Sequence, residues 1–300
     1  MVSPARRTLP LPPTAVREDR DGRFREETTF FEHRGERMFT VTHIPAHATA
    51  EVGLVICCSI LVEHLTNYRR EVLLARRLAA GGMAVQRFHY RGAGHSTGDE
   101  SQTTLASMVD DALAAADRLQ ARAGVRQVAF MGTRFGALVA AQAAGARPGG
   151  LLVFWEPVID ADRYFRELIR ARLIHELKDM RRAYGAADAW KAEMARQGLV
   201  EIMGYPLFHN LYESARGAGL QARLPDTMPA VLVVQMGGGS AVRPATEQLR
   251  AWIAERGGTT QIEVVPEDPV WLFVGQRIMN SADTPVQITA NWLVGEVARA

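Results

Sequence analysis

A short glycine-flanked turn is the segment of the chain best suited to chemistry. The apolar run Gln127–Met131 leads into Gly132–Gly136, which reads G-T-R-F-G, and an alanine-rich stretch follows. The glycines permit a sharp strand-to-helix turn whose central side chain projects above the sheet in a strained backbone conformation. Acyl-transfer enzymes need a nucleophile such as Ser, Cys or Asp there. Arg134 occupies the position, and its guanidinium stays protonated without a free lone pair, so ordinary serine hydrolysis is excluded.

The partners of such a nucleophile are also missing from the sequence. Where this turn carries a nucleophile, an acid and then a histidine follow it along the chain. The run Val231–Met236 is followed by G-G-G-S, which has no carboxylate, and Gln261–Val265 is followed by P-E-D-P, which has no histidine. The eight histidines lie at positions 33, 43, 47, 64, 89, 95, 175 and 209. Nucleophile, acid and base are therefore all absent from their expected places.

A ligand site could still form where strand ends meet. Strands ending near Cys58, Met131 and Trp155 are expected to be neighbours, so the residues that follow them would converge. Two interpretations stay open: Arg134 binds a carboxylate or phosphate of a ligand, or it pairs with Glu63 or Glu156 and closes a vacated site. The expected ligand-binding residues are Ser59, Glu63, Thr133, Arg134, Phe135 and Glu156.

A relocated nucleophile is a further alternative. Cys58 closes an apolar run and His64 follows a few residues later, so the two could act as nucleophile and base. A free cysteine in a buried strand is more often a small apolar residue. The adjacent Cys57 and Cys58 cannot make a disulfide framework or a zinc site, and no spacing predicts a metal or a cofactor.

The elements that must position these residues alternate along the chain. Strands are expected at Val52–Cys58, Ala84–Phe88, Gln127–Met131, Leu151–Trp155, Val231–Met236 and Gln261–Val265. Helices are expected at Tyr68–Ala80, Leu105–Ala123, Ala137–Ala146, Pro244–Arg256 and Pro285–Arg299. A hairpin over Phe24–His43 precedes them. Alternation of strand and helix indicates an α/β fold with a mostly parallel, doubly wound sheet.

The predicted domain organisation has three parts. Residues 1–22 form a mobile N-terminal arm, residues 23–159 and 227–300 form the α/β core, and residues 160–226 form a helical cap insertion without a convincing strand. Ligands of open α/β sheets bind at the carboxyl ends of the strands, where a cap would cover them.

The motifs also resemble a known family. The segment 84–99, AVQRFHYRGAGHSTGD, looks like the D-x-R-G-x-G-x-S segment of α/β hydrolases, with His89 at the usual Asp position. Over residues 50–225 the chain is similar to the serine-aminopeptidase-like group called exosortase A system-associated hydrolase 2, whose turn typically reads G-L-R-L-G. The resemblance implies an α/β-hydrolase fold. The name of the group implies an association with exopolysaccharide export and protein-sorting genes, without a mechanism.

Composition narrows the class of protein. The 300 residues are 47% hydrophobic and 23% charged, with a net charge of +2 and both signs interspersed, so no nucleic-acid-binding stripe is expected. No apolar stretch approaches a membrane span and no secretory signal is visible, which favours a cytoplasmic protein.

The sequence is consistent with three functional hypotheses. The leading hypothesis is a catalytically degenerate protein that binds a small anionic or acyl ligand at Arg134 and serves exopolysaccharide or related biosynthesis. The alternatives are a hydrolase or acyltransferase on esters or thioesters that uses Cys58, and a scaffold that recruits a partner. A homodimer is possible in each case.

Overall fold

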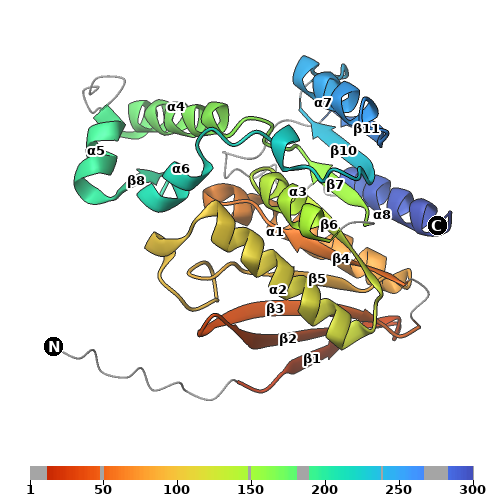
Figure 1. Ribbon diagram of the computed structural model, residues 1–300. Coiled ribbons are helices and arrows are strands. Elements are labelled where there is room, and N and C mark those ends of the chain that lie inside the picture. The colour runs from red at the N-terminus through yellow and green to blue at the C-terminus, as the bar shows by residue number, and fades with distance from the viewer. Residues whose placement is uncertain are drawn as a thin grey trace.

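A nine-stranded sheet organises the computed structural model (Figure 1). The structure describes residues 12–47, 51–147, 150–180, 189–237, 239–266 and 283–299. The strands of the sheet are β1 (Ala15–Glu18), β2 (Phe24–His33), β3 (Glu36–Pro45), β4 (Val52–Cys57), β5 (Val85–Phe88), β6 (Gln127–Thr133), β7 (Leu152–Trp155), β10 (Ala230–Met236) and β11 (Thr259–Val265). Their order is β1-β2-β3-β5-β4-β6-β7-β10-β11. From β5 to β11 the strands run parallel, whereas β1, β2 and β3 are antiparallel, so the predicted mostly parallel sheet is confirmed.

Helices cover both faces of this sheet. The helices that the structure describes are α1 (Leu61–Ala80), α2 (Leu105–Ala123), α3 (Gly136–Ala146), α4 (Ala161–Met180), α5 (Ala189–Gln197), α6 (His209–Ala215), α7 (Pro244–Ala254) and α8 (Asp283–Val297), with 3-10 turns at Glu100–Gln102 and Gln221–Arg223. Of these, α4, α5 and α6 lie beyond the strand ends rather than on a face of the sheet (Figure 1). In β4, Leu54 and Ile56 pack toward α1 and α8, while Val55 packs toward α2 and α3. Both faces of the central strands are therefore buried, which explains their nearly continuous apolar sequences.

The predicted helices agree with the structure except at the first one. The other four match within two residues at each end. Helix α1 begins at Leu61, seven residues before the predicted start at Tyr68. Its first two turns bury polar residues, including Glu63 and Asn67, so they carry no apolar period that the sequence could reveal. This earlier start places Glu63 and His64 on a helix rather than in a loop.

The segment between β7 and β10, residues 160–226, contains a hairpin that the sequence reading did not expect. Strands β8 (Leu199–Ile202) and β9 (Tyr205–Phe208) pair antiparallel around Met203 and Gly204, which both have positive φ. Each strand has only four residues, and Pro206 removes one ladder donor from β9, so the strand signal is weak. The prediction of no strand in this segment was wrong, whereas its helices are present. We call residues 160–226 the β7–β10 segment.

The N-terminal residues also differ from the expectation of a mobile arm. Residues 1–11 lie outside the described residues, but β1 pairs antiparallel with β2 from Ala15 opposite Thr28 to Glu18 opposite Arg25. All four β1 side chains are exposed, so backbone pairing rather than burial holds this edge strand and leaves no hydrophobic signal. Within the described residues, none of the helices combines the length and apolar character that crossing a bilayer requires.

Candidate functional site

The glycine-flanked turn has the predicted geometry. Strand β6 ends at Thr133, α3 begins at Gly136, and Arg134 between them has φ 51°, in the left-handed region. A Cβ atom at Gly132 would lie 2.3 Å from the Ala137 Cα, and one at Gly136 would lie 2.1 Å from the Cys57 carbonyl oxygen. Only glycine fits at both flanks, so the turn is sharp. Arg134 is held at the carboxyl end of β6 in a conformation that costs about 1–3 kcal/mol.

A buried glutamate accepts the Arg134 side chain. The Arg134 Nε donates to the Glu63 Oε1 at 3.1 Å, and the Glu63 side chain is fully buried. The other carboxylate oxygen, Oε2, accepts from the Ser59 hydroxyl at 2.8 Å and from the Tyr164 hydroxyl at 2.9 Å. The Arg134 guanidinium also lies 5.5 Å from the centre of the Tyr164 ring. One carboxylate thus joins the loop after β4, the β6–α3 turn and helix α4.

Electrostatic interactions within this network shift the pKa values of Arg134 and Tyr164. Burial alone would lower the pKa of Arg134, but the Glu63 carboxylate outweighs it and the net shift is upward. Burial and the Glu63 charge raise the pKa of Tyr164 well above its usual range, so its hydroxyl remains a donor. The network favours the interpretation in which Arg134 pairs with Glu63 and closes the site.

Glu156 was the second predicted partner of Arg134, but its carboxylate binds other groups. It follows β7 with φ 45°, and its backbone carbonyl oxygen accepts from the Arg134 Nη1 at 3.4 Å. Its carboxylate oxygen Oε2 accepts from the Met236 backbone N–H at 2.8 Å and pairs with the Arg243 guanidinium. Glu156 therefore connects the ends of β7 and β10, and its charge also helps to raise the pKa of Arg134.

Thr133 and Phe135 are both fully buried beside Arg134. The Phe135 ring lies 5.8 Å from the Tyr164 ring and 6.1 Å from the Phe165 ring, measured between centroids. Phe135 therefore packs the turn against helix α4. Of the six expected ligand-binding residues, the structure brings Ser59, Glu63 and Arg134 into one network.

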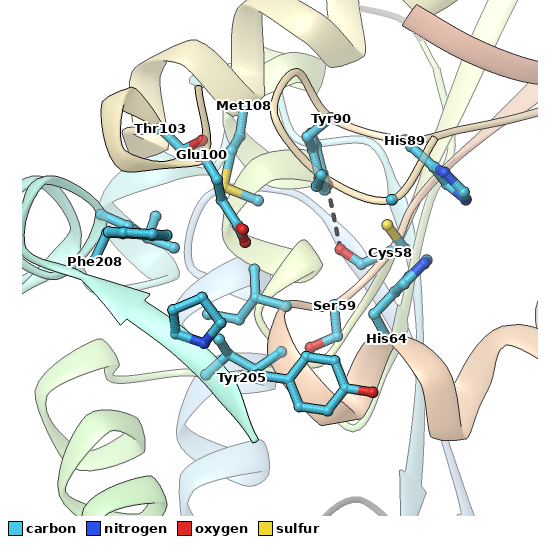
Figure 2. A pocket seen from close by; sticks show the side chains of 16 residues that line it. Cys58, Ser59, His64, His89, Tyr90, Glu100, Thr103, Met108, Tyr205 and Phe208 are labelled. Atoms are coloured by element: carbon cyan, nitrogen blue, oxygen red, sulfur yellow. Dashed lines mark hydrogen bonds between the residues drawn. The ribbon is translucent and has the colours of Figure 1, made fainter. Parts of the chain in front are cut away.

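Two cavities border that network. A cavity of about 180 Å³ reaches Ser59 and is lined by residues of the loop after β4, the loop after β5 and the β8–β9 hairpin (Figure 2). Its apolar residues are Ile60, Leu61, Met108, Pro206, Phe208 and Leu211. A second cavity of about 700 Å³ is lined by Arg134 and Tyr164, together with Arg163 and Glu167 of α4 and Arg243, which precedes α7. We call the first the apolar cavity and the second the polar cavity.

Cys58 and His64 both line the apolar cavity, but neither is activated. Burial raises the pKa of the Cys58 thiol well above its usual range, and the Glu71 carboxylate adds to this rise. Burial and the Arg87 charge lower the pKa of His64 to about 4. Within the described residues no hydrogen bond joins the two side chains, and the His64 Nδ1 has no partner. A protonated thiol beside a neutral imidazole does not supply the thiolate that nucleophilic catalysis needs.

The sequence reading missed two residues of this region. Tyr164 was not among the expected site residues, although its buried hydroxyl donates to Glu63. The sequence reading also did not consider Glu100, which lines the apolar cavity. The glycines of the 91–98 loop were the available signal, because a Cβ at Gly92 would lie 2.6 Å from the Glu100 backbone nitrogen.

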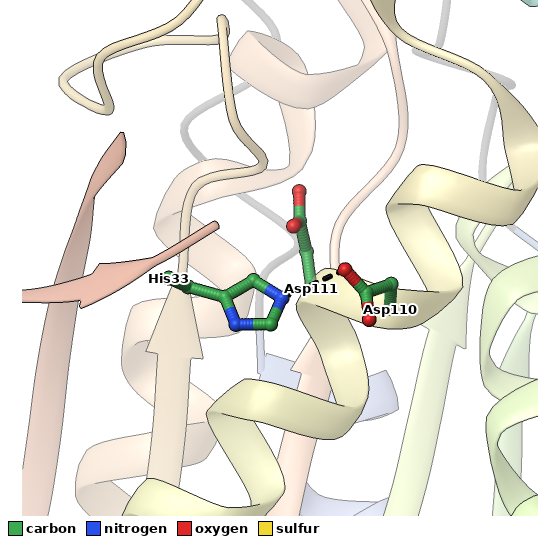
Figure 3. A group of neighbouring side chains, drawn as sticks. All are labelled: His33, Asp110 and Asp111. Carbon is green, nitrogen blue, oxygen red and sulfur yellow. Dashed lines mark hydrogen bonds and ion pairs between the residues drawn. The ribbon is translucent and has the colours of Figure 1, made fainter. Parts of the chain in front are cut away.

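A cluster of possible metal ligands lies elsewhere, at His33, Asp110 and Asp111 (Figure 3). The His33 Nε2 lies 2.7 Å from the Asp110 Oδ2. The guanidinium of Arg34 pairs with Asp110, and that of Arg91 pairs with both aspartates. Two cations already neutralise the carboxylates, so the donor set fits an ion-pair network between the β2–β3 turn and α2 better than a metal ion.

Together the sheet order, the sharp β6–α3 turn and the helices on both faces define an α/β-hydrolase fold. The family model described as serine aminopeptidase, S33, matches residues 49–191 of this chain. No match to a curated protein was found.

Solved structures agree with this architecture. Est1E from Butyrivibrio proteoclasticus, in a structure with ferulic acid bound, is 16% identical and superimposes with a TM-score of 0.62, covering 90% of this chain and 99% of that chain. The alpha/beta hydrolase domain-containing protein 10 from mouse is 12% identical, with a TM-score of 0.53, covering 91% of this chain and 98% of that chain. At these identities the likeness shows the fold alone.

Proposed function

We propose that this chain is a non-hydrolytic member of the α/β-hydrolase superfamily that binds a small acyl ligand in the apolar cavity. The observation that supports the proposal is the position of Glu63. Its buried carboxylate binds Ser59, Arg134 and Tyr164 at the place where a hydrolase would present its nucleophile. Since this arrangement holds a cation at the turn, it supports binding rather than acyl transfer.

The two cavities favour an acyl ligand over an anionic one. Arg134, Arg163 and Arg243 line the polar cavity, and each of them is paired with a glutamate. An anion would have to compete with those carboxylates. The apolar cavity, in contrast, offers aliphatic and aromatic side chains at a size that suits a short acyl chain or a single ring, because a cavity of about 150 Å³ accommodates benzene.

The β7–β10 segment acts in this proposal as a cap over the ligand. The β8–β9 hairpin and α6 supply Phe208 and Leu211 to the wall of the apolar cavity, opposite Ile60 and Leu61 of the core. Resemblance to the exosortase A system-associated group supports a cytoplasmic accessory role in exopolysaccharide or related biosynthesis.

Binding and turnover together test the proposal. Wild type, Arg134→Ala and Cys58→Ala are assayed on short- and medium-chain p-nitrophenyl esters and thioesters, and we expect none of the three to exceed the buffer rate. Hexanamide and methyl hexanoate are then titrated by calorimetry. We expect saturable binding to wild type and its loss in Leu211→Trp, which fills the cavity. Val294→Trp, a substitution at a side chain that is 51% exposed on α8, is the matched control.

Two outcomes would overturn the proposal. Wild-type turnover that disappears in Cys58→Ala would show a rebuilt catalytic centre. If neither hexanamide nor methyl hexanoate binds the wild-type protein, the interaction-protein alternative remains. A stable oligomer in size-exclusion chromatography with light scattering would support that alternative.

A further inference from the structure

Glu100 is the feature of the apolar cavity that an acyl-binding role does not explain. It begins the 3-10 turn Glu100–Gln102 between β5 and α2 and is half-buried. In Figure 2 its carboxylate points into the middle of the cavity, between Met108 and Ser59. The cavity therefore combines an apolar wall with one acidic group.

The backbone around Glu100 is built to hold it there. Gly92 has φ 77°, and a Cβ at this position would lie 2.6 Å from the Glu100 nitrogen. A Cβ at Gly98 would lie 2.9 Å from the Gly92 nitrogen. The Asp99 carboxylate caps the turn by accepting from the Ser101 N–H at 3.0 Å. Close backbone packing thus fixes the position of the Glu100 backbone beside the cavity.

Glu100 is the charged group of the cavity at neutral pH. Sixteen residues line the cavity, and the titratable side chains near physiological pH are Glu100, His64 and His89. Burial lowers the pKa of His64 to about 4 and that of His89 to about 3, so both imidazoles are neutral. The His89 Nδ1 accepts from the His95 N–H at 3.0 Å, which leaves the proton on Nε2. The cavity consequently carries one negative charge.

The Glu100 carboxylate has no counter-charge of its own in the structure. Among the described residues, no side chain forms a hydrogen bond or an ion pair with it, and burial raises the pKa of its carboxyl. A partly desolvated carboxylate of this kind repels an anionic ligand and gains from a cation that enters the cavity. The aromatic rings of Tyr205 and Phe208, in the same wall, also suit a cation.

We propose that Glu100 determines the charge specificity of the apolar cavity and that the acyl ligand also carries an ammonium group, with its short chain or ring in the cavity and the ammonium at Glu100. This inference rests on the proposed binding function, since it names the chemical class of the ligand at that site. An ammonium would donate a charge-assisted hydrogen bond to the carboxylate while the apolar part contacts Met108, Phe208 and Leu211.

Three probes with one carbon skeleton test the proposal: 3-phenylpropan-1-amine, 3-phenylpropan-1-ol and 3-phenylpropanoate. Calorimetric titration at pH 8 gives their dissociation constants for the wild-type protein. We expect the amine to bind about tenfold more tightly than the alcohol and the carboxylate to bind most weakly. Glu100→Gln should bring the amine to the affinity of the alcohol and change the alcohol affinity by less than about twofold.

The control variant is Glu201→Gln, which removes an exposed carboxylate from β8 outside the cavity and changes the net charge equally. It should keep the tenfold preference. Equal affinities of amine and alcohol for wild type, or a preference that survives in Glu100→Gln, would overturn the inference. If the alcohol binds without any amine preference, only this inference fails. If none of the three probes binds wild type while hexanamide or methyl hexanoate does, only this inference fails. If none of the five compounds binds wild type, the proposed binding function fails with it. The wild-type comparison is decisive even if Glu100→Gln does not fold.

Discussion

The Arg134 Nε lies 3.1 Å from the Glu63 Oε1, so the residue at the tip of the β6–α3 turn is neutralised by the first turn of α1. The pair combines a strained backbone at Arg134 with a carboxylate that has no exposed surface. Such strain persists only where the surroundings over-determine it. Here the glycine-flanked turn and the Glu63 carboxylate do so, and Tyr164 links the same carboxylate to α4, so the tip of this turn connects the sheet to the β7–β10 segment.

Breaking this pair should destabilise the protein strongly. Glu63→Gln keeps the size of the side chain but leaves the buried Arg134 charge without its carboxylate. We expect the free energy of unfolding in urea to fall by about 3–5 kcal/mol. The exposed pair of Arg250 with Glu247 on α7 is the control, and Glu247→Gln should cost less than about 1 kcal/mol. A cost of Glu63→Gln as small as that of the control would show that the pair contributes little.

The hydrogen bond from the Tyr164 hydroxyl to Glu63 should make its own contribution to the free energy of unfolding. Tyr164→Phe retains the ring packing against Phe135 and removes one donor from Glu63. Because the carboxylate then has a lone pair that water cannot reach, we expect a loss of about 1–3 kcal/mol in the free energy of unfolding. Amide hydrogen exchange should also accelerate in α4. Unchanged exchange in α4 would mean that the hydroxyl does not tie this helix to the core.

Restoring a hydroxyl at the turn should not restore hydrolysis. Arg134→Ser would present the usual nucleophile type, yet no histidine follows His209 in the sequence to act as its base. We expect turnover of p-nitrophenyl butyrate by Arg134→Ser to equal that by Arg134→Ala. A rate more than about tenfold above the Arg134→Ala control would show that another group serves as base.

The fold was predictable because its signals are local. The runs that form β4 and β10 are apolar along their whole length, which two buried faces require, and Gly132 and Gly136 mark a turn that only glycine permits. The hairpin β8–β9 was missed because strands of four residues carry little periodicity.

The sequence predicted several residues of the candidate site, but it did not predict the contacts between them. The sequence predicted both Glu63 and Glu156 as possible acidic partners of Arg134. The pairing with Glu63 depends on the early start of α1, and the Glu156 carboxylate instead forms an ion pair with Arg243. Glu100 was missed because its role depends on what surrounds it. A carboxylate in the sequence gives no sign that its neighbours in space are apolar.

Both cysteines should be unreactive in the folded protein. Burial is the largest cause that raises the pKa of the Cys57 thiol and of the Cys58 thiol, and their side chains are 0% and 5% exposed. Because only the thiolate reacts, iodoacetamide at pH 7.5 should label neither residue at an appreciable rate until urea unfolds the chain. Mass spectrometry of the labelled peptide reports the rate. Rapid labelling of Cys58 in the folded protein would support the hypothesis that it acts as a nucleophile.

A fully buried acid beneath the site should make stability depend on pH. Burial raises the pKa of the Glu71 carboxyl from its ordinary 4.5 to about 7, against the opposing effects of Thr133 and Arg87. Its Oε1 has no hydrogen-bond partner within the described residues. The folded state therefore retains a proton that the unfolded state has already released between about pH 4.5 and 7. In that window the contribution of Glu71 to stability declines as the pH rises.

Glu71→Gln isolates this contribution, because the amide resembles the protonated acid and does not titrate. Near pH 4 the free energies of unfolding of the variant and the wild type should be close. By pH 8 the variant should be more stable, by on the order of 3 kcal/mol, since one unit of pKa shift corresponds to about 1.4 kcal/mol. The buried His64 and His89, whose lowered pKa values act in the opposite direction below pH 6.5, are present in both proteins and cancel in the difference. Urea denaturation at one-unit intervals from pH 4 to pH 8 measures it, with Glu32→Gln, at an exposed carboxylate of β2, as the control. A difference that stays constant across this range would mean that Glu71 titrates alike in the folded and unfolded states.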